Sequence, residues 1–309
     1  VQKRLENMAE IGSFTLTEQA LRGLFYIQLY RFLTISQFAR AADYKRPNAS
    51  AQLRILERHG LLGFFGNTGK VGYGKTPKVY FLTRKGWEIL ARESEIPPEM
   101  IGNFKEVRVE SRWSPQMYHR IHTVDMLMSA EIAVRTRPQL TIVQTFLEYK
   151  RVKRGTHIMR ETTDYVGSEE KTENKIIPDA AFILENIETG NRALFFIEMD
   201  MATERIISMI TRDSRITLHY KIKQYDRYLL GQRYRQTYSA FGDFRYFTML
   251  FITLNQARVE NIRREVRDLP ADLAPYYRFT TYEQAMGDFL GRIWKSRLLS
   301  DQELYPLVR

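Results

Sequence analysis

The chain has 309 residues, 44% of them hydrophobic, so it is long enough to bury substantial cores and to form two domains. Its 47 basic and 36 acidic residues give a formal charge of +11, which suits a polyanionic partner, nucleic acid first, better than an acidic small substrate. The absence of cysteine excludes disulfides, thiolate zinc sites and cysteine nucleophiles.

No apolar run reaches the roughly 18 residues of a membrane span, and no leader pattern opens the chain, so we expect a cytoplasmic protein without a membrane partner. The chain starts at Val1 instead of methionine, which suggests a trimmed N-terminus.

Three helices are predicted near the N-terminus. Apolar residues recur at helical spacing after a Thr17 cap, and Thr34 caps a second, short helix that ends near Ala42. Pro47 opens a third helix that runs to about His59. The exposed face of this third helix is expected to carry four polar residues, Asn48, Ser50, Gln52 and Arg54.

A two-stranded ribbon is predicted after the third helix. Residues 61–65 form its first strand, residues 66–78 form a loop rich in Gly and Lys, and residues 79–82 form the return strand. This order over residues 15–92 resembles the winged helix-turn-helix, whose third helix enters the major groove and whose wing touches phosphates or the minor groove. The resemblance implies DNA contacts from Lys45, Arg46, Asn48, Ser50, Gln52, Arg54, Lys70, Lys75 and Lys78. A winged helix used only for protein contacts is the alternative, and the concentration of basic residues in the turn, the third helix and the wing favours DNA.

A linker over residues 96–116 is predicted to separate a winged-helix domain over residues 1–95 from a second domain over residues 117–309. The second domain is expected to begin with a helix and to continue with a β-rich stretch, two central strands, a helical region, a strong strand, a helix, a short strand and a final helix. A polar insertion over residues 153–174 is expected to form a loop or a flexible hairpin. The fold class is therefore α/β, with an α+β arrangement overall, in which a mixed sheet is flanked by helices.

An acidic hairpin lies at the centre of the second domain. Asp179 opens an apolar strand, a turn follows at residues 188–191, and the second strand ends with Glu198 and Asp200. Antiparallel pairing brings the three carboxylates to one end of the hairpin, and Glu198 and Asp200 share a face because side chains alternate along a strand. Clustered carboxylates repel one another, so a divalent cation such as Mg²⁺ or Mn²⁺ explains them most easily. The alternative is that all three are solvated acids at strand ends.

The order helix, three strands, helix, strand resembles the PD-(D/E)XK nuclease core, and Pro178-Asp179 with Phe196-Ile197-Glu198 resembles its two main motifs. The lysine of the second motif is Asp200 here, and a compensating lysine, Lys221, is expected on the following helix, one turn before Tyr225. The resemblance implies metal-dependent phosphodiester cleavage. It implies metal binding by Asp179, Glu198, Asp200 and Glu148, and catalytic roles for Asp179, Glu198 and Lys221. Considered alone, Glu148 is a surface acid.

The segments Glu198-Met199-Asp200, Ala202-Thr203-Glu204 and Lys221 to Tyr225 resemble the replication-relaxation family of plasmids and other mobile elements. In that family a winged helix precedes a degenerate nuclease-like core. The resemblance implies a DNA-binding protein that nicks or cleaves DNA with Mg²⁺ or Mn²⁺ in plasmid replication or mobilisation. The alternative is a non-catalytic regulator or accessory factor that keeps the nuclease fold as a scaffold, and Asp200 in place of the lysine favours it. The expected partners are DNA, a second copy of the chain on a palindromic site, and replication or transfer proteins.

Four tyrosines, Tyr225, Tyr228, Tyr234 and Tyr238, lie among the arginines that follow Lys221. Tyrosine rings can stack on bases while arginines hold phosphates, so we interpret this stretch as a secondary DNA surface. The alternative is an amphipathic helix with tyrosines at its rim.

Overall fold

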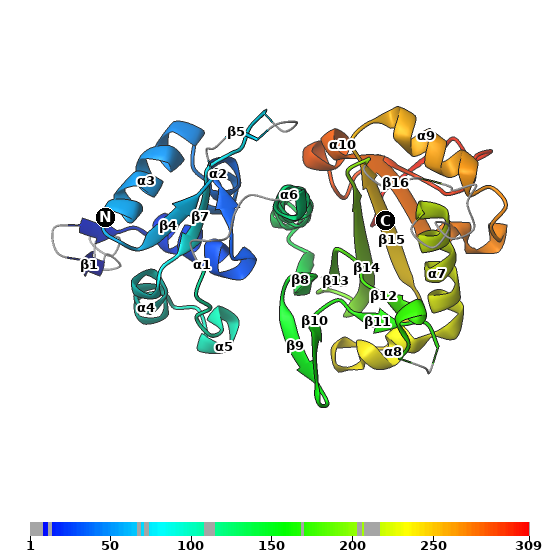
Figure 1. Cartoon of the computed structure of the whole chain (residues 1–309), viewed down its shortest axis with the longest axis horizontal. Helices are drawn as coiled ribbons and strands as arrows, with labels where there is room; N and C mark the ends of the chain where they lie inside the picture. Colours follow the sequence, from blue (N-terminus) through cyan, green and yellow to red (C-terminus); the bar gives the residue numbers. More distant parts are fainter. Residues whose placement is uncertain are drawn as a thin grey trace. The chain divides into compact units, whose positions relative to one another are not determined.

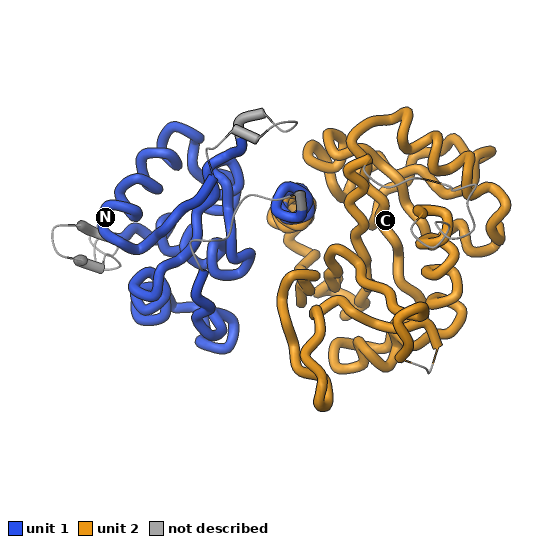
Figure 2. Tube along the Cα trace, in the orientation of Figure 1, with its two compact units in different colours: residues 1–124 blue, residues 125–309 orange. Residues whose placement is uncertain are grey.

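The structure, a computed structural model, describes residues 9–11, 14–66, 69–70, 74–107, 115–167, 170–202, 206 and 217–308. It divides into two compact units, residues 1–124 and residues 125–309 (Figure 2). Helices and strands are mixed through the chain (Figure 1), which confirms the predicted α/β class. No helix in the described part of the chain combines the length and the hydropathy that crossing a bilayer requires.

The first unit contains three helices followed by a β-ribbon, in the predicted order. These three helices are α1 (Glu18–Tyr30), α2 (Ile35–Ala42) and α3 (Arg46–Arg58), and α4 (Arg84–Glu93) and the short α5 (Pro98–Ile101) follow the ribbon. A sheet of order β3-β7-β4 joins Leu33–Thr34, Val79–Leu82 and Leu62–Phe65, and two small hairpins pair β1 (Ala9–Ile11) with β2 (Phe14–Leu16) and β5 (Gly69–Lys70) with β6 (Gly74–Lys75). The predicted start of the first helix, the predicted end of the second helix, and the predicted bounds of the third helix and of the return strand are confirmed to within about two residues.

Local chemistry accounts for the helix starts in the first unit. The Thr17 hydroxyl accepts from the backbone nitrogen of Ala20 at 3.2 Å. Thr34 and Gln37 form a reciprocal capping box that opens α2. A close approach also fixes one glycine, because a Cβ on Gly86 of α4 would lie 2.1 Å from the carbonyl oxygen of Leu61.

The segment predicted as a linker is anchored to the first unit over its described residues. The Gln28 side chain donates to the Ile101 carbonyl at 3.0 Å, and the Trp87 indole donates to the Gly102 carbonyl at 3.0 Å. Ile101 and Val107 are buried. Helix α6 (Pro115–Arg135) then runs across the division between the units.

The second unit is organised around a mixed sheet of seven strands in the order β18-β17-β16-β15-β14-β13-β8. These strands are β8 (Leu140–Leu147), β13 (Ala180–Asn186), β14 (Asn191–Asp200), β15 (Phe247–Thr253), β16 (Tyr277–Thr281), β17 (Trp294–Lys295) and β18 (Leu304–Tyr305). Strands β14, β15 and β16 are parallel, and the other neighbours are antiparallel. The remaining elements are helices α7 (Leu218–Gly231), α8 (Arg233–Thr237), α9 (Gln256–Glu265) and α10 (Tyr282–Gly287), hairpin β9 (Arg151–Arg154) with β10 (His157–Arg160), hairpin β11 (Asp164–Tyr165) with β12 (Lys175–Ile176), and the 3₁₀ turns Thr172–Asn174, Ser239–Phe241 and Ala271–Tyr276.

The core on one face of this sheet contains the four tyrosines that the sequence suggested as a DNA surface. Tyr225, Tyr228, Tyr234 and Tyr238 are each about 1% exposed and pack with phenylalanines of the sheet. Their hydroxyls still find partners, since Tyr228 donates to Asp164 and Tyr234 donates to the Arg245 carbonyl. The interpretation of this stretch as a stacking surface for bases is therefore wrong.

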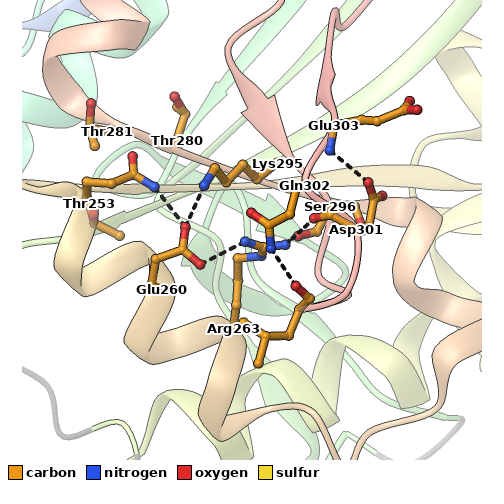
Figure 3. A network of polar contacts seen from close by, with 12 residues as sticks. Thr253, Glu260, Arg263, Thr280, Thr281, Lys295, Ser296, Asp301, Gln302 and Glu303 are labelled. Carbon is orange, nitrogen blue, oxygen red and sulfur yellow. Dashed lines mark hydrogen bonds and ion pairs between the residues drawn. The ribbon is translucent and has the colours of Figure 1, made fainter.

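Two buried arginines hold the C-terminal segment against helices α9 and α7. Arg263 of α9 donates to the carbonyls of Ser296, Leu298 and Asp301, a network drawn in Figure 3. Arg297 pairs with Asp226 of α7 at 2.8 Å. Strands β17 and β18 belong to this segment, and the sequence patterns did not predict them.

Candidate functional site

The hairpin of β13 and β14 brings the central acids together. Ala180 pairs with Ile197, and the Asp179 backbone nitrogen donates to the Ile197 carbonyl at 3.1 Å, so Asp179 lies opposite Glu198. On the other side, the Glu148 backbone nitrogen donates to the Asp179 carbonyl at 3.2 Å. Opposite residues on antiparallel strands share a face, so the register places Glu148, Asp179 and Glu198 in one row across three strands.

Helix α7 supplies a cation and a hydroxyl to this row. The Lys221 Nζ lies 2.5 Å from Glu198 Oε2, and the Tyr225 hydroxyl donates to Glu198 Oε1. Lys221 and Tyr225 are four residues apart, so both reach the sheet from the same helix face. Asp179 is fixed by the Met199 backbone nitrogen, which donates to its Oδ2 at 2.8 Å.

Burial sets the electrostatics of the site. The Glu198 side chain is 3% exposed, and this burial raises its pKa to about 8, an effect that the nearby charge of Asp179 increases and that Lys221 opposes. Burial and the neighbouring Glu198 raise the pKa of Tyr225 well above its ordinary value, so Tyr225 remains a hydrogen-bond donor. The pKa of Glu198 stays above its ordinary value even with Lys221 beside it, and positive charge at this place favours the carboxylate form.

The other two predicted metal ligands, Asp200 and Glu148, each form an ion pair with an arginine. Arg258 of α9 binds Asp200 through two nitrogens, with Nε 2.7 Å from Oδ2 and Nη2 3.2 Å from Oδ1. Glu148 is paired with Arg160 of β10. Within the described ranges, no group of three or more His, Asp or Glu side chains is placed to hold a metal ion. A metal site made by four protein carboxylates therefore does not fit this structure, and the expectation that Asp200 and Glu148 complete one has no support in it.

Asp179 and Glu198 fit a different kind of metal site. Mg²⁺ keeps several waters and is commonly bound by one or two carboxylates together with substrate phosphates. Two neighbouring carboxylates, one of them buried, match that requirement when a phosphate supplies the remaining oxygens. The residues present thus fit Mg²⁺ or Mn²⁺ shared with a phosphate, and not a cage made by the protein alone.

Most of the predicted DNA-contacting residues of the first unit lie on α3 or immediately before it. Lys45, Arg46, Asn48 and Arg54 are exposed, while Ser50 and Gln52 are half-buried. The difference follows from helical phase, because residues two apart lie about 200° apart around the axis and cannot all share one face. Arg58, four residues after Arg54, is exposed on the same side of α3 and was not among the residues predicted to contact DNA. Its spacing of four from Arg54 could have identified it, because residues four apart share a helix face.

Of the three lysines expected in the wing, the structure describes the side chain of Lys78 and not those of Lys70 and Lys75. Lys78 is paired with Glu57 of α3 at 2.8 Å, and its Nζ lies 3.4 Å from the centroid of the Phe64 ring. These contacts attach the base of the ribbon to α3. Lys78, which was expected to contact phosphate, is therefore paired with an acid of its own unit. Lys70 and Lys75 lie in β5 and β6, and their side chains are outside the described part.

Comparison with known proteins relates the chain to one family. A family model described as replication-relaxation matches residues 24–243. No protein of curated function matches the chain. A solved structure titled "Crystal structure of NadR in complex with 4-hydroxyphenylacetate" is similar, with 19% identity, coverage of 39% of this chain and 74% of that chain, and a TM-score of 0.23. At that TM-score the likeness supports no conclusion about this chain.

Proposed function

The chain belongs to the replication-relaxation family, and from this premise we propose that it binds DNA in the replication or mobilisation of a plasmid or another mobile element. The formal charge of +11 suits a polyanion. The exposed basic residues at the start of α3 and along it suit the backbone contacts of a helix that enters the major groove. The first unit would locate the DNA through α3 and the ribbon that follows.

The second unit, in this proposal, is a DNA nicking or cleaving core of the PD-(D/E)XK kind. The observation that carries the proposal is the 2.5 Å contact between Lys221 Nζ and Glu198 Oε2. Glu198 lies opposite Asp179 on the neighbouring strand of the sheet. Lys221 would take over the role of the motif lysine, which Asp200 cannot fill because it has no amine, and its contact with Glu198 is within the hydrogen-bond reach that a catalytic group requires.

Each residue has a definite task in such a core. Asp179 and Glu198 would hold Mg²⁺ or Mn²⁺, which when bound supplies Lewis acidity and lowers the pKa of water. Lys221 would orient the attacking water or stabilise the negative charge that develops on the phosphoryl oxygens. Tyr225, through its hydrogen bond, keeps the Glu198 carboxylate in one orientation.

A second candidate function is a non-catalytic regulator or accessory factor that uses the nuclease-like fold as a platform. The pairing of Asp200 with Arg258 favours it, because this ion pair occupies the position of the motif lysine. Under this alternative the acids and Lys221 stabilise the fold and take no part in chemistry.

Conversion of supercoiled plasmid separates the two functions. The full chain, Asp179→Ala and the control Asp243→Ala, whose side chain is 75% exposed, would each be incubated with Mg²⁺, Mn²⁺ or EDTA. The nuclease proposal expects nicked or linear product from wild type and Asp243→Ala with metal, and none from Asp179→Ala. If no protein cuts while all three still shift DNA on a gel, the scaffold function is correct.

A further inference from the structure

The hairpin of β9 and β10 carries only positive charge. Residues 150–160, which we call the basic hairpin, contain no acid and five basic residues, Lys150, Arg151, Lys153, Arg154 and Arg160. A two-residue turn joins its strands, with φ of +59° at Gly155, a conformation that glycine adopts without strain. Figure 1 shows the hairpin in green, extending away from the seven-stranded sheet of its unit.

The two faces of the basic hairpin differ. Cross-strand partners are Arg151 with Arg160, Val152 with Met159, Lys153 with Ile158 and Arg154 with His157. Because opposite residues share a face and successive residues alternate, the outer face holds Arg151, Lys153, Ile158 and Arg160, and the inner face holds Val152, Arg154, His157 and Met159. The inner face borders a cavity of about 440 Å³ whose other wall includes Asp164, Tyr165 and Arg233.

The basic hairpin is held in place at its base and on its inner face. The Arg154 guanidinium donates to the Thr163 carbonyl at 2.7 Å and to the Glu161 carbonyl at 2.9 Å. Lys150 pairs with Glu161 at 2.8 Å, and Arg160 pairs with Glu148. These contacts orient the ribbon before any partner binds, which lowers the entropy lost on binding.

The outer face is left open to a partner. Arg151 and Lys153 are exposed and form no ion pair within the described part of the chain. Ile158 lies directly opposite Lys153 on the neighbouring strand, with 74% of its surface exposed, and contributes little to any core. Cations that flank one exposed apolar side chain on a twisted two-stranded ribbon match a DNA groove, where phosphates line the edges and apolar groups meet sugars or bases.

We propose that the outer face of the basic hairpin lies in a groove of duplex DNA, with Arg151 and Lys153 on phosphates and Ile158 against sugar or base edges. This inference rests on the DNA binding proposed above and adds a second contact, made by the nuclease-like unit itself. Arg160 pairs with Glu148, which adjoins Asp179 in the acidic row, so DNA held by the hairpin passes close to Asp179 and Glu198. The hairpin would thus bring the phosphate backbone to the acids.

Salt titration of DNA affinity tests the cationic part of this surface. The full-length double variant Arg151→Gln/Lys153→Gln would be compared with wild type on a duplex of arbitrary sequence, with Kd measured from about 50 to 200 mM salt. Each lost phosphate contact lowers the slope of log Kd against log salt by about 0.9, so the double variant should lose about 1.8 and bind at least about 10-fold more weakly. The control Arg264→Gln/Arg267→Gln removes the same charge from exposed positions in and after α9 and should keep the wild-type slope.

Ile158→Ser tests the apolar contact separately. It should weaken binding while leaving the salt slope unchanged, because it removes no charge. Equal slopes for the hairpin variant and wild type, or an equal loss in the control, would overturn the inference while DNA binding and nicking by wild type stand. If the wild-type chain binds no duplex at all, the proposed function and this inference both fail.

Discussion

Replacing Arg263 with methionine tests how the C-terminal segment is held. Arg263 is 0% exposed, and its Nε donates to the Ser296 carbonyl at 2.8 Å. One terminal nitrogen serves both the Leu298 and the Asp301 carbonyls, and the other lies 2.8 Å from Glu260 Oε2 (Figure 3). Methionine keeps most of the buried stem and removes every one of these donors.

The expected loss follows from the carbonyls left without a donor. Each buried acceptor that loses its partner costs about 1–3 kcal/mol, and three acceptors are affected. Leu298 is 36% exposed, so its carbonyl can regain a water molecule and lies at the low end of that range. We therefore expect Arg263→Met to lower the free energy of unfolding by about 3–5 kcal/mol, the range for removing one partner of a buried charged network.

Urea unfolding measures this loss, with the fluorescence of buried Trp294 reporting on the same segment. The matched control is Arg264→Met, the next residue along, which is exposed and contacts Asn261. It should change the free energy of unfolding by less than about 0.5 kcal/mol. A loss below about 1 kcal/mol in Arg263→Met, or an equal loss in the control, would refute the reasoning.

Three further predictions follow from the same structure. Burial raises the pKa of Glu198 in the folded chain to about 8, above its ordinary 4.5. The contribution of Glu198 to the free energy of unfolding is therefore fully present below pH 4.5 and is lost as pH rises through 8. Glu198→Gln should flatten this decline of the unfolding free energy with pH, measured by urea titration with EDTA, and a decline as steep as that of wild type would contradict the prediction. Gly86→Ala should cost about 1–3 kcal/mol in thermal or urea unfolding because its Cβ meets a carbonyl oxygen, whereas Gly287→Ala, with open space around it, should be nearly neutral. Arg54→Gln on α3 should reduce the salt slope of DNA binding by about 0.9, and the ion-paired Arg92→Gln should not; equal slopes would remove Arg54 from the interface.

Local sequence determined the three N-terminal helices, the central strands and the register between β13 and β14. Thr17 and Thr34 start helices because their hydroxyls satisfy backbone nitrogens that the helix leaves free, and this signal needs only residues within one turn. The register of the acidic hairpin was equally predictable, since a short turn between two apolar strands fixes which residues lie opposite. The neighbourhood of Asp179 and Glu198 therefore followed from the sequence alone.

The partners of the polar residues were decided by tertiary structure. Alternation along β14 places Asp200 on the face of Glu198, but the Arg258 that binds it lies 58 residues later. Periodicity likewise places Tyr228 on one face of a helix, but it does not decide whether that face meets solvent or the sheet. In the structure Tyr228 packs in the core. A local pattern fixes the direction in which a side chain points, whereas the group it meets depends on which distant segment packs there, and burial of apolar area across the whole unit decides that.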